Sequence, residues 1–394
     1  MALRTLDSLG DVAGARVFVR VDMNVPLRDG IVTDDSRIRA SVPTIEELLG
    51  RGARLVVASH LGRPKGQVHE ELRLAPVGRA LAHLLGRPVT ALDVVTPALL
   101  PGDDLVVLEN LRFAPGEEAN DVAFAGALAE YADAYVDDAF GAAHRAHASV
   151  SALPELVLAT GRAAVAGRLL AREVEVLSRL LEAPERPFVA ILGGAKISDK
   201  LAVIESLTER TDALLIGGAM AFTLLAAEGG RVGASLVEHD RLPAVRDALA
   251  AARARGVAVH LPIDVVAAPA IDASVPNEVV AADAIPDGQM GLDIGPATVA
   301  AFAEVIAEAR TILWNGPMGV FELEPFSAGT RGVALACADA DAFTVVGGGD
   351  SLAAVAKEGV ADRFDHLSTG GGASLEFLEG RALPGITILE DHTT

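Results

Sequence analysis

Two lysines, Lys196 and Lys200, lie four residues apart in the segment ILGGAKISDK (191–200), in a chain whose other basic side chains are nearly all arginines. A lysine ammonium is a compact charge on a flexible stem, and it can follow a moving phosphate better than a planar guanidinium can. The apolar run 188–192 predicts a buried strand, and residues 195–207 predict a helix that carries both lysines on one face. The segment therefore indicates a phosphate site at a helix N-terminus; the alternative is two solvated lysines in a first helical turn.

In the first half of the chain, each of four apolar runs leads into charged or polar side chains. The runs are 16–22, 54–60, 104–110 and 134–140, and the residues are Asp22, Asn24, Arg37, His60, Arg63, Arg112, His144 and Arg145. Guanidinium groups suit bidentate capture of carboxylate and phosphate, and Asp22 and Asn24 could hydrogen-bond a hydroxyl on the same ligand. One arginine alone would be explained by a surface ion pair, but four at equivalent places favour an anion site. The histidines of HRAH (144–147) lack a third metal ligand, which favours an anion-binding or structural role.

In the second half, similar apolar runs end in glycines. The glycines are Gly194, Gly218, Gly349 and the run 370–372, and they would let backbone approach a flat base and phosphates closely. Asp350 and Ser351 follow in GGGDS (347–351), and an acid beside phosphates makes sense if Mg²⁺ lies between them. The alternative for this pair is helix capping alone. In WNGPMGVFE (314–322), Asn315 and Glu322 are polar groups, and Glu322 could bind a ribose.

Continuous Val, Ile and Leu runs that alternate with amphipathic helices predict an α/β protein with parallel sheets covered on both faces. Because ligands bind beyond the carboxyl ends of such strands, the two halves predict two ligand sites of opposite character. The 394 residues exceed one comfortable core. A helical pattern in 165–187, ended by Pro184, predicts a long helix that joins two domains and permits hinge motion.

The composition narrows the class of protein further. A net charge of −21 argues against nucleic acid as a partner, and the lone Cys337 lies in an apolar stretch that predicts a buried structural thiol. No apolar leader and no uncharged run of about 18 residues is visible, so we expect no membrane partner and a cytoplasmic location. The sequence contains neither a P-loop motif nor GxGxxG after the first strand, which weakens a dinucleotide-binding interpretation. The sequence contains no exposed apolar heptad repeat, so we expect a monomer.

The chain resembles the phosphoglycerate kinase family in a set of segments that run in order from about residue 16 to residue 380. They are RVDMNVP (20–26), SRIRASVPTI (36–45), SHLGRP (59–64), ENLRF (109–113), DAFGAAHRAHAS (138–149), GGAKISDK (193–200), GLDIGP (291–296), WNGPMGVFE (314–322), GGGDS (347–351) and STGGGASLEFLEG (368–380). The resemblance implies two Rossmann-like domains: residues 1–168 for phosphoglycerate and residues 169–379 for the nucleotide. It also implies that the tail, 380–394, packs back on the N-terminal domain.

The resemblance implies reversible phosphoryl transfer from 1,3-bisphosphoglycerate to Mg-ADP, which gives 3-phosphoglycerate and ATP in glycolysis and gluconeogenesis. Carried over by position, the phosphoglycerate contacts are Asp22, Asn24, Arg37, His60, Leu61, Gly62, Arg63, Arg112, His144 and Arg145. The nucleotide contacts are Gly194, Ala195, Lys196, Lys200, Gly218, Gly291, Asn315, Pro317, Glu322, Gly348, Gly349, Asp350 and Ser351, with Asp350 on Mg²⁺. Three positions depart from the family's frequent residues: Met23 for Phe, Asp137 for Asn and Ala142 for Thr. None of them removes a charged ligand.

The chemistry that follows needs no general base, because the acceptor carboxylate is already ionised at neutral pH. Catalysis would rest on positioning and on neutralising charge over the transferring oxygens. We expect Arg37 and Lys196 to neutralise that group, the Gly371 backbone to assist, and hinge closure to bring the ligands in line. A dehydrogenase on a doubly wound sheet and a non-catalytic nucleotide-binding scaffold are the alternatives, which tests for NAD binding and for ATP formation would separate.

Overall fold

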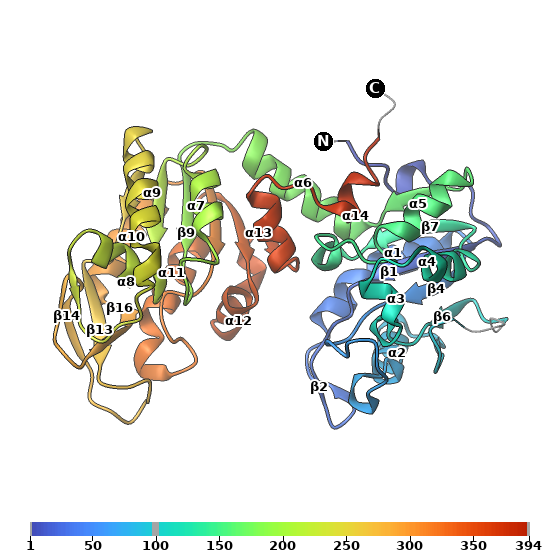
Figure 1. The fold of residues 1–394 in the computed structure, drawn as a ribbon, viewed down its shortest axis with the longest axis horizontal. Coiled ribbons are helices and arrows are strands. Elements are labelled where there is room, and N and C mark those ends of the chain that lie inside the picture. The colour runs from blue at the N-terminus through green and yellow to red at the C-terminus, as the bar shows by residue number, and fades with distance from the viewer. Residues whose placement is uncertain (1, 97–101, 392–394) are drawn as a thin grey trace. The chain divides into compact units, whose positions relative to one another are not determined.

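The computed structural model describes residues 2–96 and 102–391 (Figure 1). The chain divides into two compact units, one of Met1–Glu175 with Ala382–Thr394 and the other of Val176–Arg381. Each unit is built around its own six-stranded parallel sheet, so the α/β class predicted from the sequence is confirmed. Within residues 2–96 and 102–391, no helix combines the length and the apolar character needed to cross a membrane.

The sheet of the first unit has the strand order β5-β6-β4-β1-β7-β8. The strands are β1 (Arg16–Val21), β4 (Arg54–Ala58), β5 (Thr90–Ala91), β6 (Leu105–Val107), β7 (Ala134–Asp138) and β8 (Ala164–Ala166). In β1, Val17, Val19 and Val21 enter the core beneath α1 (Ser36–Gly50) and α2 (Ala75–Leu85). Because side chains alternate along a strand, Phe18 and Arg20 lie on the opposite face, where Phe18 stacks on Tyr135. The remaining helices of this unit are α3 (Pro115–Glu118), α4 (Val122–Ala129), α5 (Ala152–Ala159) and α14 (Pro384–Thr387).

The sheet of the second unit has the strand order β12-β10-β9-β17-β18-β19. The strands are β9 (Phe188–Leu192), β10 (Ala213–Ile216), β12 (Ala258–His260), β17 (Thr311–Asn315), β18 (Phe343–Gly347) and β19 (His366–Ser368). The helices are α7 (Leu201–Leu207), α8 (Met220–Ala227), α9 (Leu242–Ala254), α10 (Pro296–Ala307), α11 (Ala328–Asp339), α12 (Gly349–Lys357) and α13 (Gly372–Leu378). An antiparallel sheet that the sequence did not predict, β14-β13-β16, is added to this unit; its strands are β13 (Asp264–Ala268), β14 (Glu278–Ala281) and β16 (Met290–Ile294). Cys337 is buried in the core of this unit, and burial raises the pKa of its thiol, as expected for a structural cysteine.

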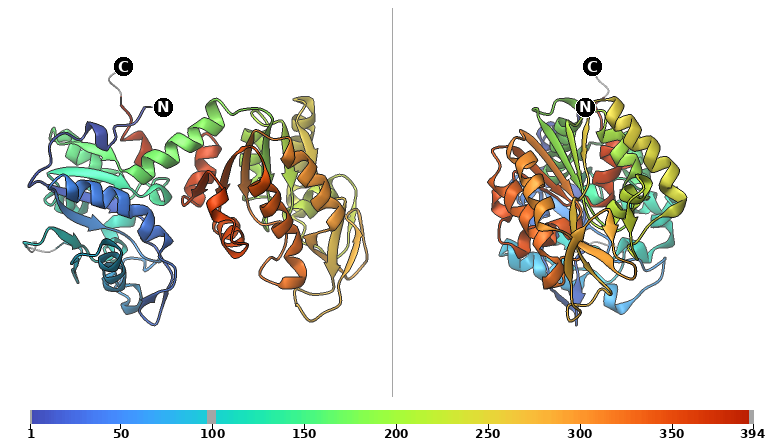
Figure 2. Two further views of the ribbon diagram at one scale, coloured as in Figure 1. Left: turned by 180° about the vertical axis from the view of Figure 1, so that it is seen from behind. Right: turned by 90° about the vertical axis from the view of Figure 1, so that its left-hand side faces the viewer.

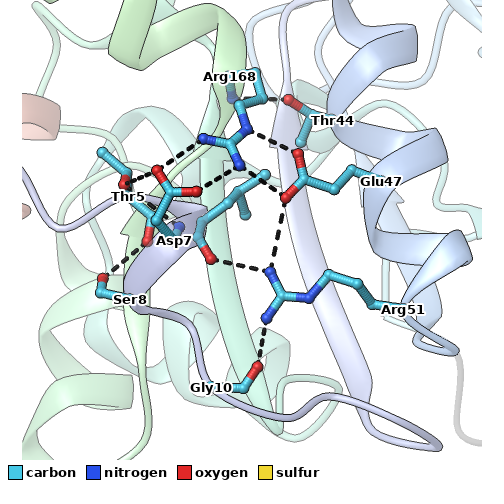
Figure 3. Close-up of polar contacts among 9 residues, drawn as sticks. Thr5, Asp7, Ser8, Gly10, Thr44, Glu47, Arg51 and Arg168 are labelled. Carbon is cyan, nitrogen blue, oxygen red and sulfur yellow. Dashed lines mark hydrogen bonds and ion pairs between the residues drawn. The ribbon is translucent and has the colours of Figure 1, made fainter.

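The long helix predicted in 165–187 is α6 (Arg168–Glu182), and its start is anchored within the first unit (Figure 3). The Arg168 guanidinium pairs with Glu47 on α1 at 2.7 Å and with Asp7 near the N-terminus at 2.7 Å. The backbone N–H of Arg168 donates to the Thr44 hydroxyl at 2.8 Å. The Asp138 carboxylate, at the end of β7, accepts from the free N–H groups of the next turn and acts as a helix cap. The first turn of α6 is therefore tied to the elements that precede and flank it.

The tail of the chain belongs to the first unit. Leu3 and Glu390 form an antiparallel bridge, and the Arg4 N–H donates to the Leu389 carbonyl at 3.0 Å, so residues 3–4 and 389–390 lie side by side (Figures 1 and 2). The Gly385 N–H donates to the Ala143 carbonyl at 2.9 Å. This contact places α14 against the loop that follows β7, which carries two of the predicted anion-binding residues.

Candidate functional site

The polar residues predicted in the first half follow strands that end at one edge of the first sheet. Asp22 and Asn24 follow β1, His60 follows β4, and Arg112 lies in a short 3-10 turn, Leu111–Phe113, after β6. β1 pairs in parallel with β4 and with β7, and β4 with β6, so their carboxyl ends share that edge. Arg37 lies in the first turn of α1, the helix that leads from β1 to β4. Sequence spacing alone therefore predicted the common edge correctly.

The loops of this edge are held by hydrogen bonds between the candidate residues themselves. The Arg37 guanidinium pairs with the Asp22 carboxylate at 2.7 Å. The Asn24 side-chain oxygen accepts from the Gly62 N–H at 2.9 Å, and Arg112 donates to the Gly62 carbonyl at 2.8 Å. The loop 59–64 is thus fixed from both sides by residues of other loops, and a ligand meets a prearranged surface.

The basic side chains at this edge lie so close together that their charges lower one another's pKa values. Burial, then the charge of Arg20, lowers the pKa of the Arg112 guanidinium, which is only 8% exposed. Burial, then the neighbouring Arg112, lowers the pKa of His147 to about 4. Arg63 and Arg145 are exposed, and Arg145 contributes to the shifts of both Arg112 and His147. A field that disfavours added positive charge favours an anion, so this cluster is suited to bind phosphate or carboxylate.

Three buried residues support the cluster and were missed from the sequence. Arg20, Ser149 and Glu117 are each fully buried. Arg20 donates to the Ser149 hydroxyl at 2.8 Å, and this hydroxyl donates to the Glu117 carboxylate at 2.6 Å. A charged residue inside the apolar run RVFVRVD was the available signal for Arg20, whereas nothing in the sequence pointed to Glu117. His144 is half-buried in the same loop as Arg145.

Two of the predicted glycine-ended strands, β9 and β10, lead into loops whose Gly194 and Gly218 line a cavity of about 470 Å³. A Cβ on Gly193 would lie 2.1 Å from the Pro317 carbonyl, and one on Gly218 would lie 2.5 Å from the Gly194 nitrogen. Gly194 and Gly218 also have φ values of +109° and +66°, which side chains rarely adopt. Close approach of backbone segments therefore requires glycine at 193 and 218, and a positive φ favours it at 194 and 218. Gly194, Ala195 and Pro317 line the opening between these segments. The close approach of this backbone to a ligand stays a prediction.

The lysine segment differs from the predicted helix start. α7 begins at Leu201, and residues 198–200 form a turn before it, so Lys196 and Lys200 do not share a helix face. Ile197, between them, is fully buried, which anchors the turn and separates the two side chains. Lys200 is 8% exposed and donates to the backbone and side-chain oxygens of Asn315, whereas Lys196 is exposed. Burial lowers the pKa of Lys200 to about 8.

Both lysines line a polar cavity of about 340 Å³, together with Gly348, Asp350 and Ser351. Gly194, Ala195, Pro317 and Asp350 line this cavity and the larger one alike, so the two are halves of one site. Gly348 has a φ of +90° at the start of α12, which turns the chain there. The buried Ser351 hydroxyl accepts from the Gly316 N–H at 2.6 Å and so also holds the loop.

The residues present fit a nucleotide-bound Mg²⁺. Asp350 is an exposed carboxylate in the first turn of α12, and its charge acts on the pKa of Lys200. Mg²⁺ is commonly held by one or two carboxylates together with substrate phosphates. Two carboxylates, Asp199 and Asp350, line the polar cavity together with the two lysines, which matches that arrangement. Gly371, with a φ of +54°, stands at the start of α13, where the backbone N–H groups of a helix are free.

The larger cavity is lined mainly by apolar side chains that the sequence did not single out. They include Phe222, Leu236, Pro262 and Ile271, with Glu322 at the same site. A Cβ on Gly291 would lie 2.1 Å from the Phe222 ring, which explains the glycine predicted there. Asp293 also lines the cavity; burial raises the pKa of its carboxyl to about 7, and both oxygens accept backbone N–H groups. An apolar hollow beside a polar one suits a base joined to phosphates.

Comparisons with known proteins agree with this arrangement. Residues 6–381 match the family model described as phosphoglycerate kinase. The chain is 55% identical to the phosphoglycerate kinases of Moorella thermoacetica and Thermomicrobium roseum, over 99% of this chain and 100% of each relative. Its structure resembles that of the enzyme from Coxiella burnetii, with a TM-score of 0.88, 42% identity and 98% coverage of both chains. For the enzyme from Pyrococcus horikoshii the TM-score is 0.84, the identity is 31%, and 98% of each chain is covered.

Proposed function

Because the chain belongs to the phosphoglycerate kinase family and catalyses reversible phosphoryl transfer between 1,3-bisphosphoglycerate and ADP, we propose that each unit binds one of the two substrates. Residues 1–168 bind the phosphoglycerate and residues 169–379 bind the nucleotide, with residues 380–394 as a structural part of the first domain. The observation that carries this division is the crowding of cations on one unit, with an apolar cavity beside a glycine-lined polar one on the other.

The phosphoglycerate site uses the cations of the first unit. Arg37, Arg63, Arg112 and Arg145, with His60 and His144, bind the carboxylate and phosphate oxygens, while Asp22 and Asn24 bind the hydroxyl group. Leu61 and Gly62 contribute the loop backbone, which the contacts of Asn24 and Arg112 with Gly62 hold in place. Bidentate guanidinium contacts give this site its preference for planar or tetrahedral anions.

The nucleotide site uses the cavities of the second unit. Gly194, Ala195, Gly218, Gly291 and Pro317 frame the base, Glu322 binds the ribose, and Lys200 and Asn315 approach the phosphates, joined by the backbone of Gly348, Gly349 and Ser351. Asp350 binds Mg²⁺, which when present neutralises the nucleotide phosphates. We further propose that the enzyme works as a monomer in the cytoplasm, where glycolytic substrates occur, without nucleic-acid or membrane partners.

The transfer step needs charge neutralisation rather than a proton acceptor. Arg37 and Lys196 neutralise the transferring phosphoryl group, and the Gly371 backbone donates to its oxygens. Closure of the two units about a hinge at α6 brings the ligands in line and excludes water. The exposure of Lys196 and the anchoring of the buried Lys200 support this division of labour between the two lysines.

A pair of variants tests the division of substrates. Arg112→Ala should weaken 3-phosphoglycerate binding about tenfold or more and leave Mg-ADP binding unchanged, since a buried charged contact is lost. Asp350→Ala should do the reverse. Isothermal titration calorimetry with each ligand measures both, and Asp341→Ala, which alters a fully solvated carboxylate, is the control. If either variant weakened both ligands equally, or the wrong ligand, the assignment would be rejected.

A further inference from the structure

Arg20 makes a contact with His60 that fixes which ring nitrogen of His60 can donate a hydrogen bond. The Arg20 Nη2 atom lies 3.2 Å from His60 Nδ1, and both residues are buried. A guanidinium has five N–H donors and no acceptor, so Nδ1 must be the acceptor in this contact. In a neutral imidazole with a bare Nδ1, the proton sits on Nε2.

The guanidinium of Arg20 is itself held in a single orientation. Its Nε donates to the Ser149 hydroxyl at 2.8 Å, and Nη1 donates to the carbonyl of Val21. The Ser149 hydroxyl and N–H both donate to the buried carboxylate of Glu117, at 2.6 and 3.0 Å. This relay orients the Ser149 hydroxyl so that its oxygen accepts from Arg20. Two anchors on one planar group leave Nη2 aimed at His60.

We propose that Arg20 is a positioning residue, which holds His60 as a neutral Nε2–H donor for the anionic oxygens of the phosphoglycerate. The inference rests on the proposed function, in which His60 contacts that ligand. Protonation of His60 at Nδ1 would place its N–H against the donors of Arg20 and would cost the contact. His60 therefore differs from the arginines around it, because it contributes a directed hydrogen bond and no charge.

The surroundings of His60 act in the same direction. Burial, then Arg20, holds the pKa of His60 well below its usual value, and the charges of Arg112, Arg37 and His147 add to the effect. These groups come from β1, α1, the turn after β6 and the loop after β7, so cations face the ring from several elements. The Glu117 carboxylate lies beyond Ser149, on the far side of Arg20.

The decisive measurement is made on the wild-type protein. Heteronuclear NMR of ¹⁵N-histidine-labelled enzyme distinguishes the Nε2–H form, the Nδ1–H form and the imidazolium, with His60→Gln used to assign the resonance. We expect the neutral Nε2–H form from about pH 5.5 to about pH 8, the range in which an unperturbed histidine titrates. We also expect 3-phosphoglycerate to shift the Nε2 resonance.

Suppose that wild-type His60 is an imidazolium or an Nδ1–H form, and that its resonance still shifts on adding 3-phosphoglycerate. This result would overturn the inference and leave the proposed site standing. A correct tautomer whose resonance 3-phosphoglycerate does not move would overturn the positioning role and remove His60 from the proposed site. The two failures are therefore distinguishable.

Variants add a kinetic readout. Arg20→Met should raise the KM for 3-phosphoglycerate about tenfold, leave the KM for ATP unchanged, and shift the His60 Nδ1 resonance, because the orienting donor is lost. Arg16→Met, on the same strand but partly exposed, is the matched control and should change none of these. His60→Gln, whose amide nitrogen can replace Nε2–H, should retain more affinity for 3-phosphoglycerate than His60→Asn, which replaces Nδ1. Equal losses in the two His60 variants, or an unchanged His60 signal in Arg20→Met, would contradict the proposal.

Discussion

The two proposed ligand surfaces differ in the groups that form them. In the first unit, side chains form the surface and other side chains hold them: Asp22 pairs with Arg37, and Arg20 contacts His60. In the second unit, glycine backbone lines much of the polar cavity, and apolar side chains line most of the larger one. A site made of side chains can be weakened one contact at a time, whereas crowded glycines such as Gly193 and Gly218 leave no room for a Cβ.

The two kinds of surface also lower the stability of the folded state in different ways. Burial of Arg20, Glu117, Asp137 and Asp138 removes charges from water, and each must recover the loss through hydrogen bonds. The glycine loops bury few charges, but they restrict residues that are highly flexible in the unfolded chain. The first unit is therefore expected to respond to pH and to changes of charge, and the second to changes of volume.

The largest effect is expected from Gly316→Ala. Gly316 has a φ of +102°, and a Cβ there would lie 2.3 Å from the Gly193 carbonyl oxygen and 3.0 Å from the Lys200 ammonium. Neither the backbone oxygen nor the buried lysine can move away easily, so we expect loss of Mg-ADP binding and destabilisation of about 3 kcal/mol or more. Calorimetry and urea denaturation measure the two effects.

Gly126→Ala is the matched control for that variant. Gly126 lies in α4, has no atom within 4 Å of an added Cβ, and does not have a positive φ, so alanine should be neutral or slightly stabilising there. A Gly316→Ala enzyme that bound Mg-ADP normally would show that the loop can yield, and the contrast between the two surfaces would lose its basis.

Arg37→Ala should give the next largest effect. Its charge is proposed to act on the transferring group, so turnover should fall on the order of 10³, as for other arginines that neutralise a phosphoryl transition state. Mg-ADP affinity should stay unchanged, because the nucleotide is assigned to the other unit. Steady-state kinetics with both substrates saturating separates these effects. Arg39→Ala, two residues further along α1 at a mostly exposed ion pair with Asp35, should behave like wild type. Near-normal turnover in Arg37→Ala would remove Arg37 from the mechanism.

The sequence predicted the main elements that carry the two proposed surfaces, because each of these elements is local. Each apolar run and the residue after it lie within a few positions, so strands β1, β4, β6, β7, β9, β10 and β18 and the residues at their ends were placed correctly. The lysine segment was the exception. Residues 195–200 have helix-forming types, but burial of Ile197 and the bonds from Lys200 to Asn315 draw the segment into a turn. Contacts 115 residues apart override local preference there.

What the sequence did not predict depends on long-range partners. Glu117 acts through Ser149, 32 residues away, and Arg20 acts through His60, 40 residues away. The apolar lining of the larger cavity comes from Phe222, Leu236 and Ile271, whose types are ordinary for a core. Side chains that support or line a site have no local pattern, and they become visible when the fold brings them together.

Asp137→Asn tests the electrostatic cost that the first unit carries. Asp137 is fully buried at the end of β7; its Oδ1 accepts from the Ala139 N–H, and among the described residues no group donates to Oδ2. Burial raises the pKa of its carboxyl from 3.8 to about 6. A raised carboxyl pKa means that the folded state holds the proton more tightly, so this group lowers stability as pH rises from 3.8 to about 6 and keeps it lowered above that range.

An uncharged amide removes this penalty, so Asp137→Asn should raise the free energy of unfolding by about 1–3 kcal/mol near neutral pH, with no gain below about pH 4. Urea denaturation across this pH range measures the difference. Asp133→Asn should change stability in the opposite direction, because hydrogen bonds from Arg16 outweigh the effect of burial there and lower the pKa of the Asp133 carboxyl. Equal stability of Asp137→Asn and wild type at every pH would show that the buried carboxylate is compensated, and the first unit would then carry no more electrostatic cost than the second.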